Sequence, residues 1–314
     1  MPTDLEAAIA ELRPALLRHY YRMVGSYAEA EDVLQDALER AWAARATYRG
    51  EAPLQRWLFT IATNTCLNAL GRRKRQLFLP QLEREPEGPD FTIGPREPER
   101  FVSPAPDARL FPDPAEQSES REAVALAFVA LLQRVPPKQR AALLMKDVLG
   151  WSAEEIAEAL ELTVSSVNSA LHRSRTAVAS NASHDEPPPA VLRSFVRAWE
   201  ERDIDGLVAL LRNDIALAMP PYSMWFRGIE GVLAFLQSST FSSFWSAGVR
   251  LVETRANALP AFAFYRSTED GTFAPHSVMV VRFVAGRAAE MTVFLGAAQF
   301  SFFDLPPTLD RTVS

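Results

Sequence analysis

The segment from 165 to 175, SSVNSALHRSR, carries side chains that could read nucleic acid. At helical spacing, Val167 and Leu171 fall on one side of this segment and short polar side chains fall on the other. Short hydroxyl and amide groups let a helix approach the edges of bases, and arginine pairs with guanine or with phosphate. The polar side therefore suits contact with DNA, although a helix face that is only solvated has the same composition. The candidate DNA-reading residues are Ser165, Ser166, Asn168, Ser169, His172 and Arg173.

The residues before this segment predict the element that would present it to DNA. The sequence WSAEEIAEALELT predicts a helix from about Ala153 to Leu160, followed by a short turn. Thr163 can cap a second helix, in which Val164 and the later apolar residues face the first. Two short helices joined in this way form a helix-turn-helix, whose second helix enters the major groove. Glu161 stands where such turns often have glycine, and a left-handed backbone there costs a non-glycine residue roughly 1 kcal/mol.

Net charge limits how this chain can bind DNA. The formal net charge is −6 at pH 7. Non-specific affinity for DNA comes mainly from Lys and Arg side chains that neutralise phosphates. An acidic chain therefore does not grip DNA tightly by itself, and a nucleic-acid role requires local basic patches or a partner that supplies charge.

Length and cysteine content narrow the class of protein. A chain of 314 residues predicts two or three domains, and its single cysteine, Cys66, excludes an intramolecular disulfide and a cysteine-based zinc site. The N-terminus MPTDLEAAIAEL lacks the features of a signal peptide, and no apolar run approaches the ~18 residues of a membrane span. We expect a cytoplasmic protein without membrane contact, and nothing in the sequence indicates a metal or a cofactor.

Composition divides the chain into five segments. Two of them have helical periodicity throughout, and in the first Ser26 and Glu29 have the spacing of a capping box. The segment between these two is crowded with proline, which predicts an extended or disordered linker whose phenylalanines could dock on a neighbour. After a second, shorter linker, two helices precede β-rich segments, with hairpin signals at Asp270-Gly271 and Gly286-Arg287. The five segments are 1–76, 77–118, 119–180, 181–189 and 190–314. The predicted fold is multidomain, with two all-α parts and an α+β domain.

Two blocks of the chain resemble one known family. Region 2 of the extracytoplasmic-function (ECF) sigma factors of bacterial RNA polymerase is similar to LLRHYYRMVGSYAEAEDVLQDALERAWAARATYRGEAPLQRWLFTIATNTCLNALGRRKR. Region 4 of the same family is similar to VALLQRVPPKQRAALLMKDVLGWSAEEIAEALELTVSSVNSALHRSR, and the blocks follow the family's order. The resemblance implies a sigma factor that binds core RNA polymerase, at the β′ clamp helices and the β flap, and directs promoter-specific transcription initiation. Region 2 would melt and trap the −10 element, and the helix-turn-helix of region 4 would read the −35 element.

The resemblance also implies which residues of region 2 make these contacts. The helix AEDVLQDAL would dock on the β′ clamp helices through Asp32, Gln35 and Asp36, which one helical turn places on a single side. A solvated acidic face is the alternative for these three residues.

For the −10 element, the resemblance points to the loop TYRGEAP and to the helix that follows it. Tyr48 would stack on an extruded base, and Asn64 would hydrogen-bond the edge of that base, with Asn68 one turn further along the same face. A locally paired asparagine is the alternative for Asn64. The dense basic run suits phosphate contact beside the melted strand, and a frayed, solvated helix end is its alternative. This run consists of Arg72, Arg73, Lys74 and Arg75.

The C-terminal segment resembles the SnoaL-like fold, a curved sheet wrapped by helices into a cone with a pocket. The resemblance rests on SFVRAWEERDIDGLVALLRNDIALAMPPYSMWFRGIEGVLAFL and on the β-rich segments after it. A small molecule could occupy the pocket, and the residues expected to line it are Trp199, Tyr222, Trp225, His276 and Phe294, with Met219, Phe226 and Met279 as further candidates.

Regulation of the sigma factor in cis is the role expected for this domain. His276 has no paired carboxylate in the sequence to assist acid–base chemistry, so we expect no catalytic residue and no enzyme activity. The competing interpretations are a stand-alone helix-turn-helix regulator with a ligand-binding domain and a DNA-binding module fused to a SnoaL-like enzyme.

Overall fold

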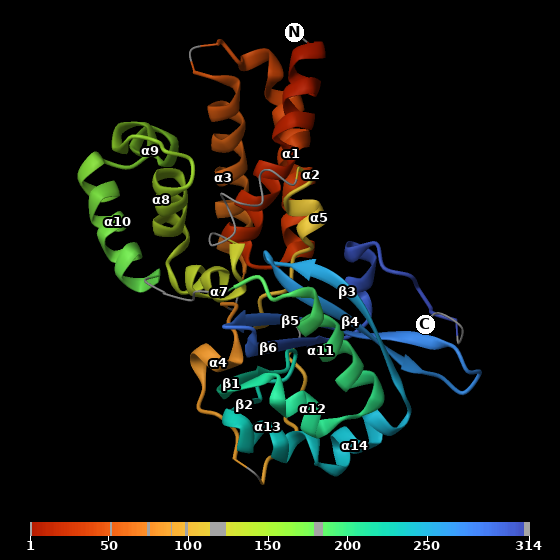
Figure 1. Cartoon of the computed structure of the whole chain (residues 1–314). Helices are drawn as coiled ribbons and strands as arrows, with labels where there is room; N and C mark the ends of the chain where they lie inside the picture. Colours follow the sequence, from red (N-terminus) through yellow and green to blue (C-terminus); the bar gives the residue numbers. More distant parts are fainter. Residues whose placement is uncertain are drawn as a thin grey trace. The chain divides into compact units, whose positions relative to one another are not determined.

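A computed structural model describes most of the chain (Figure 1). The described residues are 2–50, 52–73, 76–88, 90–97, 100–113, 124–178 and 185–310. The chain divides into two compact units, of which the first contains 1–78 and 109–181 and the second contains 79–108 and 182–314. Each unit is described separately.

The described part of the first unit is built from helices. They are α1 (Pro2–Val24), α2 (Tyr27–Ala44), the short 3-10 helix η1 (Arg45–Thr47), α3 (Leu54–Arg72), α7 (Leu126–Arg134), α8 (Pro137–Asp147), α9 (Ala153–Leu160) and α10 (Val164–Val178). A further turn, α5 (Asp107–Leu110), crosses the boundary between the two units. Helices α1, α2 and α3 lie side by side (Figure 1). They enclose fully buried side chains that include Tyr20, Tyr21 and Phe59.

Side-chain caps set where these helices begin. The Ser26 hydroxyl accepts a hydrogen bond from the N–H of Glu29 at 3.4 Å, as the capping-box spacing predicts, and the Glu29 carboxylate pairs with Arg73. Ser152 and Glu155 form a complete capping box at the start of α9. Each of these caps satisfies N–H groups that have no partner within their own helix.

The helix-turn-helix forms where the sequence predicts it. Helix α9 has the expected bounds, and Thr163 Oγ1 accepts the N–H of Ser166 at 3.1 Å as the cap of α10. Glu161 takes the left-handed conformation, with φ 53°, between the two helices. The expected inward position of Val164 is wrong, because this side chain is 37% exposed. As the first residue of α10, Val164 lies ahead of the stripe that packs, where Val167 is fully buried.

The described part of the second unit combines helices with one mixed sheet of six strands. The helices are α4 (Pro80–Glu83), α11 (Pro189–Glu201), α12 (Ile204–Ala209), α13 (Gly228–Leu236), α14 (Ser239–Ser246) and the 3-10 helix η5 (Ala298–Phe303). The strands are β1 (Leu211–Ala218), β2 (Trp225–Arg227), β3 (Val249–Ala256), β4 (Leu259–Ser267), β5 (Phe273–Val284) and β6 (Arg287–Leu295). Their order is β2-β1-β6-β5-β4-β3, with β1 and β6 parallel and the other neighbours antiparallel. The α+β architecture expected for a SnoaL-like domain is thereby confirmed.

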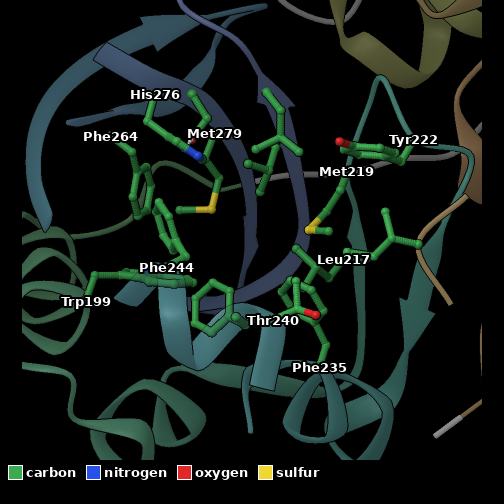
Figure 2. Close-up of a pocket in the computed structure, with 15 residues that line it drawn as sticks. Trp199, Leu217, Met219, Tyr222, Phe235, Thr240, Phe244, Phe264, His276 and Met279 are labelled. Carbon is green, nitrogen blue, oxygen red and sulfur yellow. Dashed lines mark hydrogen bonds between the residues drawn. The ribbon is translucent and has the colours of Figure 1, made fainter. Parts of the chain in front are cut away.

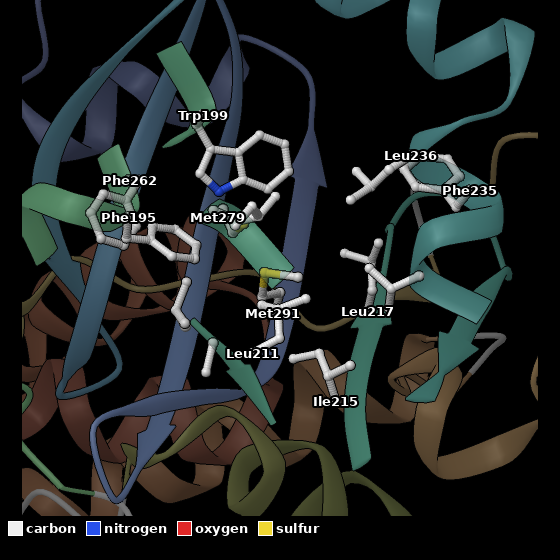
Figure 3. Packing of buried hydrophobic residues seen from close by; sticks show 14 of the residues in the cluster. Phe195, Trp199, Leu211, Ile215, Leu217, Phe235, Leu236, Phe262, Met279 and Met291 are labelled. Carbon is white, nitrogen blue, oxygen red and sulfur yellow. The ribbon is translucent and has the colours of Figure 1, made fainter. Parts of the chain in front are cut away.

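The core of the second unit lies between the sheet and its helices. Helices α11 to α14 lie together beside the curved sheet (Figure 1). Helix α11 begins with Pro189, whose fixed φ suits the first helical turn, and it buries Phe195 and Trp199. These two rings pack with Phe262, Met279 and other side chains that point inward from the strands (Figure 3). Alternation along each strand places these side chains on the face that α11 covers.

Tight turns join the antiparallel strands. Gly271 (φ 82°) follows Asp270 between β4 and β5, and Gly286 (φ 71°) lies between β5 and β6, so both predicted hairpins are confirmed. A third hairpin, between β3 and β4, has no glycine and was not predicted. Its turn residues are Asn257 and Ala258, and both have positive φ.

The proline-rich segment from 79 to 108 packs within the second unit. Its N–H groups at Glu87 and Glu97 donate to the carbonyls of Trp225 and Pro221, both at 2.8 Å. Phe91 packs against Phe226 with ring centroids 5.0 Å apart. Apart from α4, residues 79–97 of the segment that are described have no regular helix or strand, and hydrogen bonds to the domain satisfy part of the backbone.

Candidate functional site

Helix α10 presents the predicted DNA-reading face to solvent. Val167, Ala170 and Leu171 are buried, whereas the side chains assigned to DNA contact are all exposed. Ser166 also donates or accepts a hydrogen bond with the Thr163 hydroxyl at 2.8 Å, so part of its capacity is used at the cap. The exposed set is Ser165, Ser166, Asn168, Ser169, His172 and Arg173.

Arg175, a second arginine of α10 besides Arg173, already forms an ion pair within the protein. Arg175 contacts Asp147 of α8 through Nε at 3.1 Å, and this bidentate pair raises the pKa of the Arg175 guanidinium. Arg173 is exposed and has no hydrogen bond or ion pair among the described residues. Arg173 is therefore the arginine of this helix that can bind an external group without breaking an internal pair.

Helix α2 carries the predicted acidic face. Asp32, Gln35 and Asp36 are exposed on one side of the helix, opposite the buried Val33, Leu34 and Ala37. Gln35 lies 3.5 Å from Glu39, the next acid along the same side. The three predicted residues therefore form one accessible polar surface.

The described residues predicted for the −10 element lie in the loop after η1, on α3 and directly after α3. Asn64 and Asn68 are exposed one turn apart on α3. The Tyr48 hydroxyl donates to the carbonyl of Ala52 at 2.7 Å, and the ring lies 5.3 Å from that of Trp57. Contacts within its own loop thus hold Tyr48 in place, while part of its side chain remains accessible to solvent.

Only part of the predicted basic run can be placed. Arg72 is exposed at the end of α3. Arg73 is half-buried, donates to the carbonyl of Val24 at 2.8 Å and pairs with Glu29, so it holds α3 against the start of α2. Lys74 and Arg75 lie outside the described residues.

The second unit contains a pocket of about 210 Å³ on the helical side of the sheet (Figure 2). Of the five residues predicted to line it, Trp199, Tyr222 and His276 do so, as do the further candidates Met219 and Met279. Figure 2 shows His276 and Met279 on one side of the pocket and Met219 and Tyr222 on the other.

Strand pleating explains why two of the five predicted residues lie elsewhere; the further candidate Phe226 is buried in the core and does not line the pocket either. Val293 and Leu295 of β6 line the pocket, so Phe294 between them points to the opposite face of the sheet. Trp225 likewise alternates with the core residue Phe226, and its indole N–H donates to the carbonyl of Arg84 at 2.9 Å. Trp225 therefore serves as a contact for the proline-rich segment.

His276 is the only histidine among the described residues that line the pocket, and it is uncharged at neutral pH. Burial, followed by the nearby positive charge of Arg266, lowers its pKa to about 4. Its Nδ1 lies 3.1 Å from Ser277 Oγ, and its ring stacks on Phe244 with centroids 4.4 Å apart. Among the described lining residues there is no carboxylate, lysine or arginine.

The sequence indicated that phenylalanines of the proline-rich segment could dock on a neighbour, but it did not indicate that this segment forms part of the pocket wall. Ile93 lines the pocket, and Phe91 packs beside it on Phe226 and Phe235. The isolated apolar residues of the sequence FTIG were a usable signal, because a segment that stays solvated has little need of them. The site at which they dock could not be predicted from neighbouring residues, because it forms only when the domain folds.

Membrane-spanning helices and metal-ligand clusters are both absent from the part of the chain that the structure describes. In the ranges that the structure describes, no helix is both long enough and apolar enough to cross a membrane. Within the same ranges, no three His, Cys, Asp or Glu side chains gather as metal ligands would.

Comparison with known proteins identifies the family. Residues 8–76 match the family model "Sigma-70 region 2", and residues 125–178 match "Sigma-70, region 4". The chain is 36% identical over 316 residues to the ECF RNA polymerase sigma factor SigG of Mycobacterium tuberculosis (strain ATCC 25618 / H37Rv), a match that covers 98% of this chain and 85% of that protein. It is 28% identical over 240 residues to the ECF RNA polymerase sigma factor SigJ of the same strain, covering 72% of this chain and 70% of the relative.

A solved structure shares the fold over nearly the whole chain. The crystal structure of the M. tuberculosis extracytoplasmic function sigma factor SigJ matches with a TM-score of 0.63 at 20% identity, covering 96% of this chain and 99% of that one. Two sigma-70 family models in the order of regions 2 and 4, together with a relative that matches over 98% of this chain, agree with the helix-turn-helix described above. The chain therefore belongs to the ECF sigma factors of RNA polymerase and directs promoter-specific transcription initiation.

Proposed function

We propose that this sigma factor docks on core RNA polymerase through α2, captures the melted −10 strand beside α3 and reads the −35 duplex with α10. In the same proposal, its C-terminal domain controls these steps in cis by holding the linker between regions 2 and 4. The exposed polar faces of the three helices support the first part. The acidic net charge is compatible with promoter binding, because several modest contacts of one assembly add through their high effective concentration.

Core docking would use Asp32, Gln35 and Asp36 against the β′ clamp helices, with region 4 held at the β flap. Exposed carboxylates on one side of a helix attract a basic partner and speed its association. Dissolved salt screens this electrostatic attraction. The affinity of this sigma factor for core polymerase should therefore fall as ionic strength rises.

Capture of the −10 element would use Tyr48, Asn64 and Asn68, with Arg72 at a backbone phosphate. An aromatic face stacks on any base, whereas an amide can pair with one base edge. The Asn64→Ala variant should reduce the reactivity of unpaired promoter thymines to permanganate in the open complex, while the duplex complex still forms. Gln55→Ala, an exposed change on the same helix, is the matched control. Equal melting by both variants would exclude Asn64 from this role.

The contacts of the linker carry the proposal for control in cis. The segment from 79 to 108 joins regions 2 and 4 in the chain, and it is held by the C-terminal domain at several separate places. An extended chain spans about 3.3–3.6 Å per residue, so a released linker lets the two regions reach much further apart than a folded one. Holding the linker therefore restricts the spacing at which regions 2 and 4 can engage a promoter.

One group of these contacts lies at the turn between β3 and β4. Ala105 exchanges two hydrogen bonds with Asn257, and the Asp107 carboxylate accepts the N–H of Ala258 at 2.8 Å and pairs with Arg255. Asp107 is buried, so the loss of its partners leaves a charge without compensation. We call residues 105–107 with the turn at 257–258 the linker clasp.

Opening of the linker clasp tests control in cis on the full-length chain. Asn257→Gly keeps the backbone conformation of the turn and removes the side-chain bond to Ala105. With core polymerase and a cognate promoter, this variant should initiate transcription at a rate that differs from the wild type, and trypsin should cut the linker faster. Asp214→Asn, at an exposed pair in the same domain, is the control. Faster linker cleavage with unaltered transcription would overturn control in cis.

The C-terminal domain is proposed to bind a ligand without turning it over. His276 is uncharged, and no second acid or base faces it among the described lining residues, which leaves general acid–base catalysis without a pair. A molecule bound by the domain should be recovered chemically unchanged after long incubation with the full-length protein. A new product seen by mass spectrometry would overturn this part of the proposal.

A further inference from the structure

The pocket of the C-terminal domain has the size of a small ring compound. Its volume is about 210 Å³. An engineered apolar cavity of about 150 Å³ in another protein accepts benzene, whereas drug-sized ligands occupy roughly 300–1,000 Å³. The space between Trp199, Phe235, Phe244 and Phe264 therefore fits a single substituted ring.

The walls of the pocket restrict the charge of that compound. Most lining side chains are aromatic or aliphatic, and none of those described carries a charge at neutral pH. An ion placed there would lose its hydration without a counter-charge, which costs far more free energy than burial of a neutral molecule. The pocket therefore selects uncharged ligands.

A few polar groups can orient such a ligand. His276 uses Nδ1 towards Ser277, and neither its Nε2 nor the Tyr222 hydroxyl has a hydrogen-bond partner among the described residues. Thr240 adds a hydroxyl where α14 meets the opening. A ligand with one oxygen can satisfy His276 Nε2 as donor or acceptor, because the Ser277 hydroxyl permits either tautomer.

The linker forms part of the pocket wall. Ile93 lines the pocket and is 38% exposed, and Phe91 packs on Phe226 and Phe235 two residues earlier. Glu97 donates its N–H to the carbonyl of Pro221, next to Tyr222. A ligand that touches Ile93 gains contacts only while the linker is docked, so binding and docking stabilise each other by the same free energy.

We infer that this pocket is a sensor site for an uncharged, single-ring, largely apolar molecule with one hydrogen-bonding oxygen, and that the bound molecule holds the linker on the C-terminal domain. The inference rests on the proposed control in cis and names the ligand class that would drive it. Occupancy of the pocket would shift the linker toward its docked state and thereby change the activity of the sigma factor.

The binding experiment uses full-length protein and three probes of similar size. Acetophenone and 4-methylphenol are uncharged at pH 7, and benzoate carries a negative charge. Saturation-transfer NMR titrations should show that both neutral probes bind at least 10-fold more tightly than benzoate. Thr240→Trp fills the opening from an exposed position and should abolish binding without loss of the fold. Equal binding of benzoate, no binding of either neutral probe, or unchanged binding by Thr240→Trp would each overturn the site.

Two further variants separate the orienting group from the linker contact. His276→Phe keeps a ring against Phe244 and should weaken acetophenone about 10-fold while ethylbenzene binds as before. Ile93→Ala should weaken both compounds, and Val148→Ala, an exposed aliphatic change in the first unit, should weaken neither. An equal loss of acetophenone and ethylbenzene in His276→Phe would remove the hydrogen bond from the inference.

Linker protection distinguishes failure of this inference from failure of control in cis. Saturating acetophenone should slow tryptic cleavage after the linker arginines at least threefold in the wild type and have little effect in Ile93→Ala. If the probe binds without protection, the coupling is wrong. If Asn257→Gly alters transcription and no neutral probe binds, control in cis stands and the ligand site falls. If the probe binds and protects while Asn257→Gly transcribes normally, the site stands and control in cis falls.

Discussion

Asn257 satisfies both backbone polar groups of Ala105. The N–H of Asn257 donates to the carbonyl of Ala105, and its side-chain oxygen accepts from the N–H of Ala105, each at 3.0 Å. The turn that presents Asn257 has φ values of 57° and 61° at Asn257 and Ala258. A left-handed conformation is uncommon for alanine and costs roughly 1 kcal/mol. The hydrogen bonds to the linker offset this cost, so the turn and the linker stabilise each other.

Substitution of Asn257 should separate the two contributions. Asn257→Ala loses the bond to Ala105 and places a second alanine at positive φ, so the free energy of unfolding should fall by about 2–3 kcal/mol. Glycine adopts the left-handed conformation without strain, so Asn257→Gly should lower the free energy of unfolding by about 1 kcal/mol less than Asn257→Ala does. Urea unfolding of the full-length chain measures both values, and an equal loss in the two variants would contradict the strain argument.

Arg173 should carry specific recognition by α10. Arg173→Ala removes an exposed arginine of this face and should reduce transcription from −35-dependent promoters by about 5- to 150-fold, equivalent to about 1–3 kcal/mol for a bidentate contact. Affinity for core polymerase should stay unchanged. Arg175→Ala is the matched control, because Arg175 pairs with Asp147 in the free protein. Equal loss in both variants would show that general positive charge, and not a directed contact, is what matters.

The exposed side of α2 should decide affinity for core polymerase. Asp36→Ala in combination with Asp32→Ala removes two exposed carboxylates without disturbing the buried side of the helix. Holoenzyme formation, measured by fluorescence anisotropy, should weaken about 10-fold or more and depend less steeply on salt. Glu11→Gln, an exposed change on α1, serves as the control. Unaltered affinity of the double variant would exclude this surface.

Buried His19 should make the helical unit sensitive to acid. Burial, with a smaller contribution from Arg22, lowers the pKa of His19 from 6.5 to about 3, and its Nε2 lies 2.9 Å from Thr63 Oγ1. Between pH 3 and pH 6.5, His19 therefore carries a proton in the unfolded chain but not in the folded chain. The contribution of His19 to the free energy of unfolding is fully present above pH 6.5 and decreases as the pH falls toward 3, by up to about 1.4 kcal/mol per pH unit.

His19→Gln removes the titration and keeps a hydrogen-bonding side chain opposite Thr63. The decrease in unfolding free energy between pH 7 and pH 5 should be smaller in this variant than in the wild type. Urea unfolding followed by far-UV circular dichroism, which is dominated by helices, measures the difference. The same pH dependence in both proteins would contradict a neutral buried His19.

The helical parts were predictable because their signals are local. The bounds of α9, the cap at Thr163 and the left-handed Glu161 all follow from residues within one or two turns of the positions concerned. The same holds for the two glycine-containing hairpins. The partners of Arg73, by contrast, are the Val24 carbonyl and the Glu29 carboxylate, more than 40 residues earlier in the chain, and no residue close to Arg73 in the sequence indicates them.

The pocket was predictable in composition but not in detail. Trp199, Tyr222 and His276 do line it, whereas the pleat of the sheet turns Phe294 to the other face. A shift of one position reverses the face of a strand residue, so assignments in β-rich sequence depend on a register that the sequence pattern leaves open. The hairpin at Asn257 was missed because its turn has no glycine.

By itself, the amino-acid sequence determined the family, the order of regions 2 and 4, the helix-turn-helix and the α+β class of the C-terminal domain. Those features depend on periodicity, caps and motifs that are read within short windows. Only the tertiary structure decided where the proline-rich segment lies, because proline and scattered apolar residues specify no partner of their own. The clasp at Asn257 and the place of Ile93 in the pocket wall require surfaces that exist only after distant strands and helices have packed together.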